Sequence, residues 1–346
     1  MTVALFLKSY LEPTHHAIGQ LLSGINRINF NIYTKHIYET KDLAYDNVLK
    51  INIIKNKQLP IIEDSKIIHS IYDGDLSFIA GMASQKYNKP LIVSFHGGFD
   101  TNSKIYNRKY FHRTKSLLKQ TDLITVISKK DYCRIRKLVP SKKILLVPVP
   151  ISFKTLPQIN QNRSKVNLVT IGRFIPKKGI DIAIKVLAML PNRYTLTIIG
   201  DGELREELVN LTKSLNLNNR VTWTGLVSYN EMLKHLNNSS LLLHLARIAD
   251  DGNAEGTPQT ILLAQALRIP IITTHTGSIG EIIKNYKTGI IVDINNIEQI
   301  SSYVTKILEW NKFANISNES YDQVAKHHSL NQILNTWGKI YSKLSH

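Results

Sequence analysis

The chain has 346 residues and a hydrophobic fraction of 43%, which is enough for two domains with packed cores. Its single cysteine, Cys133, excludes an internal disulfide and fits a reducing cytoplasm, and no Cys/His spacing typical of a metal site is present. No stretch reaches the roughly 18 continuous apolar residues of a membrane-spanning helix. The apolar residues 1–8 are expected to form a first strand rather than a signal peptide.

The net charge of +18 is unevenly distributed along the chain. Residues 1–160 hold 24 Lys and Arg against 11 Asp and Glu, whereas the remaining residues hold 20 against 15. The basic first part favours an anionic partner, namely a membrane surface, a phosphate-bearing substrate or a nucleic acid.

The first part of the chain alternates β-type runs with helical ones. Strands are expected at 3–7, 29–34, 67–70, 90–95, 123–127 and 144–148, and helices at 14–22, at 76–87 and from 129. Ser128 is a suitable N-cap for the last of these helices. This alternation predicts βαβ units around a parallel sheet.

A second series of strands and helices follows a polar linker at 152–165. Its strands are expected at 167–171, 194–199, 221–224, 241–245 and 270–273, and its helices at 179–189, 204–215, 229–236 and 258–267. The expected fold class is therefore α/β, with two doubly wound domains at 1–155 and 165–320. Ligands of such sheets bind beyond the carboxyl ends of the strands, so the cleft between the domains is the expected site.

Terminal helices are expected at 302–310 and 329–344. Trp337 and Tyr341 are four residues apart and so share one helix face, which favours packing on a domain surface. The C-terminal helix, residues 325–346, is expected to pack back on the first domain.

One loop-to-helix segment, residues 249–266, suggests a phosphate site. Gly256 lets the backbone approach a ligand, and Pro258 fits the first turn of a helix. The free N–H groups of that turn favour an anion, with the Glu255 carboxylate beside it. The alternative is an ordinary junction with a capping acid.

Three more loops follow predicted strands. His96 opens HGGFD, where an imidazole can lie beside a ligand, although a tight turn with a surface histidine is the alternative. In GRFIPKKG, residues 172–179, Arg173 and one lysine can clamp a diphosphate, unless this is a solvated basic loop. The loop GDGE, residues 200–203, is mostly architectural.

These segments resemble the motifs of a known family, the retaining nucleotide-sugar glycosyltransferases of the GT-B fold (group 1, family four). The resemblance is strong over residues 166–295 and weaker in the first part, where it rests on FHGGFD at 95–100 and VIS at 126–128. The matching segments are GRFIPKKG at 172–179, IGDGELR at 199–205, EGTP to LLAQA at 255–266, THTGSIGE at 274–281 and NYKTGIIV at 285–292.

The resemblance implies two Rossmann-like domains facing across a cleft and a retaining transfer from a UDP- or GDP-type sugar donor. No cofactor and no metal are implied, and Asp250-Asp251 is interpreted as part of a solvated loop. His96 and Glu255 match the residues beside the reacting sugar and are the expected catalytic residues. Donor diphosphate binding is implied for Arg173, Lys178, Gly256, Thr257 and Gln259, with Lys178 a better match than Lys177.

One position departs from the family pattern. A second glutamate, which contacts the nucleotide ribose in the family, is replaced here by Leu263. Leucine cannot accept those hydrogen bonds, which weakens donor binding, requires another way of holding the ribose, or indicates a non-catalytic relative.

A basic helix with interleaved aromatic residues is expected after the His96 loop. It can lie on an anionic membrane or neutralise a lipid-linked acceptor, whereas the alternative is a solvated helix with Tyr110, Leu117 and Leu118 facing the core. Its cationic patch comprises Lys104, Arg108, Lys109, Arg113 and Lys115.

The leading hypothesis is a cytoplasmic glycosyltransferase, peripheral on the inner face of the plasma membrane. Its partners are a nucleotide-sugar donor, a glycan or lipid-linked acceptor and the anionic membrane surface, and its expected role is surface polysaccharide or lipopolysaccharide synthesis. The alternatives are a non-catalytic GT-B subunit that activates a partner enzyme, and a GT-B epimerase or phosphorylase. A nucleic-acid partner is not expected, because no recognition motif is present.

Overall fold

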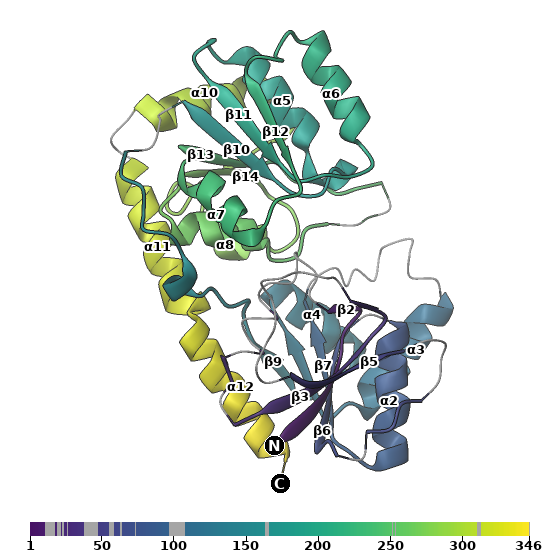
Figure 1. The fold of residues 1–346 in the computed structure, drawn as a ribbon. Coiled ribbons are helices and arrows are strands. Elements are labelled where there is room, and N and C mark those ends of the chain that lie inside the picture. Colours follow the sequence, from purple (N-terminus) through teal and green to yellow (C-terminus); the bar gives the residue numbers. More distant parts are fainter. Residues whose placement is uncertain are drawn as a thin grey trace. The chain divides into compact units, whose positions relative to one another are not determined.

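The computed structural model describes residues 1–10, 18, 22, 24–25, 27–37, 48–54, 59–62, 64–72, 74–96, 108–162, 166–250, 252, 254–309 and 313–345. The chain divides into two compact units (Figure 1). Unit 1 comprises residues 1–152 and 328–346, and unit 2 comprises residues 153–327.

Unit 1 is built on a seven-stranded sheet with the order β5-β3-β1-β6-β7-β8-β9, and all its pairings are parallel. Both faces of such a sheet are covered in most proteins, so its strands carry nearly continuous apolar runs. The strands are β1 (Thr2–Phe6), β3 (Asn29–Thr34), β5 (Val48–Ile53), β6 (Ile67–Ile71), β7 (Leu91–Phe95), β8 (Leu123–Val126) and β9 (Ile144–Leu146), with β2 (Ser9–Tyr10) and β4 (His36–Ile37) forming a separate pair.

The two faces of this sheet pack into separate apolar cores. Val3 and Leu5 of β1 belong to one core, while Ala4 and Phe6 belong to the other, as the alternation of side chains along a strand requires. The helices of the unit are α2 (Asp75–Tyr87), α3 (Arg108–Gln120), α4 (Lys129–Leu138) and α12 (Leu330–Leu344).

Helix α12 returns from the end of the chain to the core that contains Val3. Its residues Trp337 and Tyr341 are buried there with their rings 5.4 Å apart, so the prediction that they share a packed face is confirmed. The Tyr341 hydroxyl lies 2.7 Å from Nδ1 of the buried His69. Residues 325–328 belong to the preceding helix, because α12 begins only after Ser329.

Unit 2 contains a six-stranded parallel sheet with the order β12-β11-β10-β13-β14-β15. Helices α5, α6 and α10 contribute to one core with this sheet, whereas α8 packs against β13 and β14. The strands are β10 (Asn167–Ile171), β11 (Thr195–Ile199), β12 (Val221–Gly225), β13 (Leu241–His244), β14 (Ile271–Thr274) and β15 (Ile290–Val292). The helices are α5 (Ile180–Met189), α6 (Arg205–Ser214), α7 (Tyr229–Asn237), α8 (Gln259–Ala266), α9 (Ile279–Ile282), α10 (Ile297–Glu309) and α11 (Phe313–His328), with short 3-10 turns η2 (Phe153–Thr155) and η3 (Pro176–Lys178).

The predicted strands and helices of both series are largely confirmed, within one or two residues at most ends. Ser128 caps α4, and its hydroxyl accepts a hydrogen bond from the Asp131 amide at 3.0 Å. Most of the helix predicted at 14–22 lies outside the described residues. The strands β2, β4, β5 and β15 and the helices α9 and α11 were not predicted, and α10 begins five residues before the helix predicted at 302–310.

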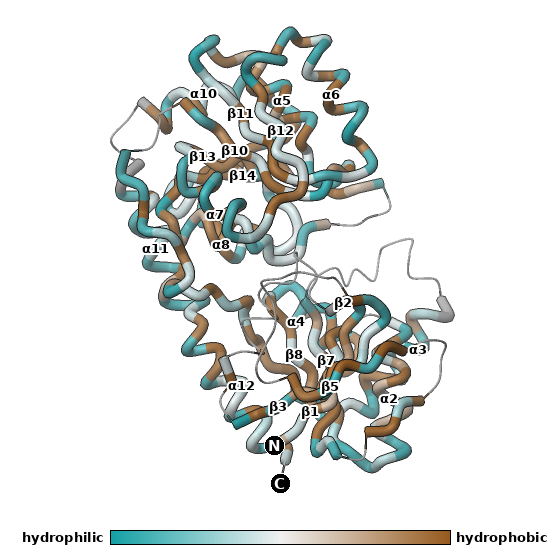
Figure 2. Tube along the Cα trace, in the orientation of Figure 1, coloured by the Kyte–Doolittle hydropathy of each residue, from teal (hydrophilic) through white to brown (hydrophobic). Residues whose placement is uncertain are grey.

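Hydrophobic residues run along the strands of both sheets, and many of the helices carry both brown and teal residues (Figure 2). This is the distribution that amphipathic helices on a buried sheet require. Among the described residues, no helix combines the length and the apolar character needed to cross a membrane.

Candidate active site

The sheet of unit 2 has a switch point beside β10. β11, which follows β10 in the sequence, pairs on one side of it, and β13 pairs on the other. Connections on the two sides run to opposite faces of a doubly wound sheet, which leaves a crevice at the carboxyl ends of the two strands. β10 leads into Gly172 and β13 ends at His244, so the residues that follow these strands are placed at the crevice.

The basic loop after β10 is held close to the end of β13. Gly179 has a φ of 60°, and a Cβ atom there would lie 1.8 Å from the Leu245 carbonyl oxygen, so glycine is required. The Lys177 carbonyl accepts a hydrogen bond from the Arg247 amide at 2.9 Å. The Arg247 guanidinium in turn forms an ion pair with Asp181 at 2.7 Å. Arg247, which was not predicted as a site residue, therefore anchors the two lysines of the loop.

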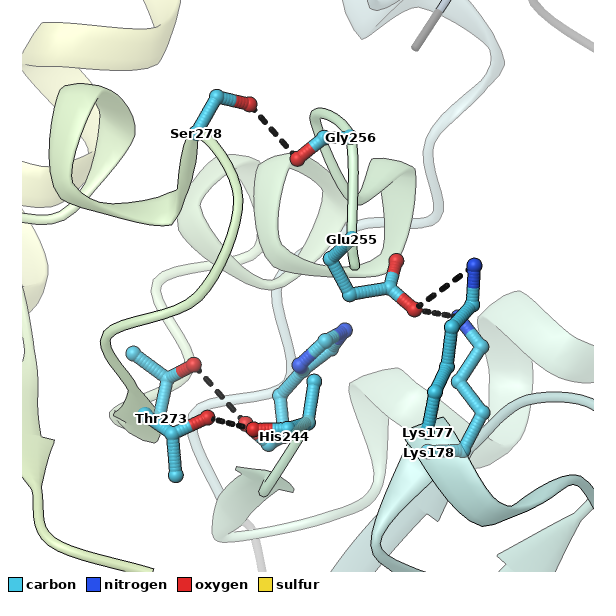
Figure 3. A network of polar contacts seen from close by, with 9 residues as sticks. Lys177, Lys178, His244, Glu255, Gly256, Thr273 and Ser278 are labelled. Atoms are coloured by element: carbon cyan, nitrogen blue, oxygen red, sulfur yellow. Dashed lines mark hydrogen bonds and ion pairs between the residues drawn. The ribbon is translucent and has the colours of Figure 1, made fainter. Parts of the chain in front are cut away.

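The Glu255 carboxylate is buried in an ion pair with this loop. Its Oε1 lies 2.8 Å from the Lys178 Nζ and 4.0 Å from the Lys177 Nζ, and only 7% of its side chain is exposed (Figure 3). Burial by itself raises the pKa of the carboxyl group, but the neighbouring cations, Lys178 first and then Lys177, outweigh burial and lower the pKa. Glu255 is therefore an anion in this site at neutral pH.

The turn from Gly256 to Gln259 is fixed by the loop before α9. Ser278 donates its hydroxyl to the Gly256 carbonyl at 2.6 Å (Figure 3). The Ser278 hydroxyl also lies 3.1 Å from the Thr257 hydroxyl. Pro258 is the N-cap of α8 rather than its first helical residue, so the predicted helix start was one residue early. Proline has no side chain that can cap a helix, so no side-chain capping hydrogen bond satisfies the first N–H groups of α8.

His244 is a functional-site candidate that sequence reasoning missed. It is only 4% exposed, and neither ring nitrogen has a hydrogen-bond partner in the part of the chain that the structure describes. Burial, assisted by Lys178 and opposed by Glu255, lowers its pKa to about 4. Figure 3 shows the imidazole pointing toward the Glu255 carboxylate. A signal was present in the sequence, since this histidine ends an otherwise apolar strand at the switch point.

Three further predicted positions in unit 2 differ in their surroundings. The Arg173 side chain is exposed. Leu263, which replaces the expected second glutamate, is 1% exposed within α8. Gln259 lies in the first turn of α8, and its amide nitrogen is buried without a hydrogen bond to any described residue.

His96 lies in unit 1, directly after β7. It is half-buried and lines a small cavity with His69, Trp337 and Tyr341. Burial and, to a smaller extent, the nearby His96 lower the pKa of His69 to about 3, so His69 stays neutral in the core. The two predicted catalytic residues therefore belong to different units, His96 to unit 1 and Glu255 to unit 2.

The basic helix of unit 1 is α3. Leu117 and Leu118 are buried, and Tyr110 packs edge-on against Phe78, as the core-facing alternative required. Arg113 stacks over the Phe78 ring at 4.1 Å. Lys104 and the side chains of Arg108 and Lys109 lie outside the described residues, whereas Lys115 is partly exposed.

Lys177 and Lys178, which lie beside Glu255, have side chains that are 14% and 19% exposed. Asp250 is exposed, and Asp251 lies outside the described residues. In the described ranges, no three His, Cys, Asp or Glu side chains are grouped to hold a metal ion.

Known proteins resemble this chain in both sequence and fold. A model of the family "Glycosyl transferases group 1" matches residues 153–326, which include every site residue described in unit 2. An uncharacterized glycosyltransferase of Methanocaldococcus jannaschii is 23% identical over 95% of this chain and 93% of its own. An amylovoran biosynthesis glycosyltransferase of Erwinia amylovora is 22% identical over 74% of this chain and 64% of its own.

A solved structure shares the whole architecture. HepE of Anabaena, crystallised in complex with UDP-glucose, superimposes with a TM-score of 0.84 over 99% of this chain and 100% of its own, at 14% identity. Both units accordingly have the Rossmann-like form of GT-B proteins. The family match and the motifs of unit 2 lead to one conclusion: the chain belongs to the group 1 glycosyl transferases.

Proposed function

We propose that this protein transfers a sugar from a nucleoside-diphosphate sugar to a glycan or lipid-linked acceptor with retention of anomeric configuration. The observation that carries the proposal is the buried Lys178–Glu255 pair at 2.8 Å, placed beside the start of α8 at the switch point. Lys178 and the first N–H groups of α8 offer a cation and hydrogen-bond donors to a diphosphate. Glu255 offers an anion to the sugar that the diphosphate carries.

The chemistry of the transfer fits these groups. When the bond between the sugar C1 and the phosphate oxygen breaks, the electron pair leaves with the diphosphate. Lys178, Arg173 and the first N–H groups of α8 stabilise that developing charge. The acceptor hydroxyl oxygen forms the new bond to C1 and gives up its proton. With retention in a single step, the acceptor attacks the face from which the diphosphate departs, so the departing phosphate oxygen is the nearest base for that proton.

The Glu255 carboxylate serves the sugar in this proposal. As an anion it accepts hydrogen bonds from sugar hydroxyls and stabilises positive charge that develops at the ring. His96 is proposed to act on the same sugar from unit 1. No cofactor or metal has a part in the proposed reaction.

The proposed donor carries UDP or GDP, and the proposed setting is surface polysaccharide or lipopolysaccharide synthesis at the inner face of the plasma membrane. The UDP-glucose complex of HepE supports a UDP donor, and the amylovoran biosynthesis enzyme among the relatives supports a role in polysaccharide synthesis. A second candidate function is that of a non-catalytic subunit, which the buried Leu263 favours because it removes an acceptor for the ribose hydroxyls.

Removal of the Lys178 ammonium is expected to weaken UDP or GDP binding. A charge-assisted hydrogen bond contributes about 1.5–3 kcal/mol, so Lys178→Ala should raise the dissociation constant at least about tenfold. Isothermal titration calorimetry with each nucleotide measures the effect. Lys213→Ala, at an exposed position in the last turn of α6, removes the same charge outside the site and should bind like the wild type. Equal affinity of Lys178→Ala and wild type would contradict the proposed diphosphate site.

Membrane association is expected to depend on the basic face of α3. Each lysine near an anionic surface contributes about 1 kcal/mol, so Lys115→Glu and Lys119→Glu together should reduce binding to anionic vesicles by more than about tenfold. Co-sedimentation at low and at physiological salt measures this, with Lys213→Glu on unit 2 as the matched charge reversal. Wild-type protein that shows no salt-sensitive binding removes the membrane from the proposal.

A further inference from the structure

His244 is the buried polar group of the site whose place in the proposed reaction is still open. Buried ring nitrogens without hydrogen bonds are rare and destabilising, so a retained one points to a partner acquired in another state. The His244 carbonyl accepts a hydrogen bond from the Thr273 hydroxyl at 2.9 Å, which fixes its backbone to β14. The ring itself is directed toward the Glu255 carboxylate (Figure 3).

In the proposed reaction, Lys178 has two anionic partners, the Glu255 carboxylate and the donor diphosphate. In the unliganded protein its ammonium compensates the Glu255 carboxylate at 2.8 Å. The stem of Lys178 lies against Gly172, where a Cβ atom would lie 3.1 Å from its Cδ, so this glycine leaves the room that the side chain occupies. A diphosphate bound in this crevice therefore draws on the ammonium that Glu255 uses.

Glu255 then needs a second partner, because a buried carboxylate whose cation is shared is strongly destabilised. Lys177 is the next cation, but its Nζ is 4.0 Å from the same Oε1. The other group facing the carboxylate is His244, with both ring nitrogens available among the described residues. An imidazole N–H, or an imidazolium if a proton is taken up, supplies the missing donor.

We propose that His244 is a positioning residue that takes over the Glu255 carboxylate when a donor diphosphate engages Lys178. The inference rests on the proposed function, because it assigns Lys178 to the diphosphate. Glu255 thereby stays in place for the sugar, and the site gains proton affinity as the ligand binds.

The sign of the pH dependence follows from the charges that face His244. These are Glu255 ahead of α8 and Lys178 in η3, with Lys177 beyond them, while β14 contributes the uncharged Thr273. In the unliganded protein His244 is neutral, since burial and Lys178 lower its pKa to about 4. A diphosphate bound to Lys178 brings negative charge close to His244, and this charge raises the pKa of His244. Affinity for the diphosphate therefore increases as the pH falls toward the pKa that His244 has in the liganded protein, and protons are taken up on binding.

The test is calorimetric binding of UDP at pH 6 in buffers of different ionisation enthalpy, for wild type, His244→Leu and His244→Gln. We expect proton uptake with wild type, its loss in both variants, and an affinity for His244→Leu lowered about tenfold, the effect of one unsatisfied buried group. His244→Gln retains an N–H donor and should recover most of that affinity without the proton uptake. The titration of UDP itself is common to all three proteins and cancels in the comparison.

Thermal unfolding of the unliganded proteins gives a readout that separates positioning from folding. His244→Leu should unfold at a higher temperature than wild type, because an unpaired polar ring is replaced by an apolar group. Wild-type affinity and proton uptake in His244→Leu would overturn the inference while leaving the diphosphate site intact. Failure of the wild type to bind UDP or GDP, or an unchanged nucleotide affinity in Lys178→Ala, would instead overturn the proposed function. This inference would fall with it.

Discussion

Glu255→Gln is expected to reduce sugar transfer by about 10²- to 10³-fold, the loss typical of one electrostatic contact to a transition state. The amide retains the shape of the side chain but carries no charge to stabilise the sugar as the diphosphate leaves. UDP affinity should be unchanged or higher, because the substitution releases Lys178 from the 2.8 Å ion pair. Donor hydrolysis and transfer assays, paired with calorimetric UDP binding, measure the two effects separately.

Glu298→Gln supplies the matched control, since this glutamate is exposed in the first turn of α10. It should transfer sugar like the wild type. Full activity of Glu255→Gln would remove Glu255 from the catalytic site. If the wild type binds UDP through Lys178 yet transfers and hydrolyses no donor, the non-catalytic subunit that Leu263 favours becomes the better description.

Gly277→Ala is expected to displace Glu255 without changing any charged group. Gly277 has a φ of 56°, and a Cβ atom there would lie 1.5 Å from the Glu255 carbonyl oxygen. The backbone at Glu255 must move to relieve this overlap, and a shift of about 1 Å in a catalytic group costs about 10²-fold in rate. The left-handed backbone adds about 1–2 kcal/mol of destabilisation for any residue with a Cβ atom.

Gly225→Ala separates these two effects. Gly225 has a φ of 69°, yet no atom lies within 4 Å of the Cβ position. It should show the cost of the backbone conformation alone, as a small decrease in the unfolding temperature with transfer activity retained. Thermal unfolding and transfer assays on both variants measure the difference. Similar activity in the two variants would mean that the Gly277 contact does not hold Glu255 in place.

Local patterns accounted for most of the secondary structure. Continuous apolar runs such as 91–95 and 241–244 define strands buried on both faces, and the Ser128 hydroxyl marks a helix start with a local hydrogen bond. These are properties of neighbouring residues in the chain. They do not depend on what the element later packs against.

Two of the elements that were missed, α11 and β5, lack such patterns. The buried residues that recur at helical spacing in α11 are Ser317, Ser320, Val324 and His328. Three of these four are polar, so the sequence shows no apolar stripe. The Ser320 hydroxyl bonds the Thr288 carbonyl at 3.0 Å, a contact that exists only in the folded unit. The strand β5 is an edge strand with Leu49, Ile51 and Ile53 exposed, so burial does not set its pattern.

The sequence by itself predicted most of the strands and helices and the loops that follow them, and it singled out Glu255 and Lys178 as candidate site residues. The tertiary structure decided which side chains meet, because β13 pairs with β10 only through a crossover that skips two strands. That pairing brings the 172–179 loop to Glu255 and distinguishes Lys178 at 2.8 Å from Lys177 at 4.0 Å. It also buries His244 beside them. Local sequence cannot specify such contacts, since they arise from the free energy of packing the whole sheet.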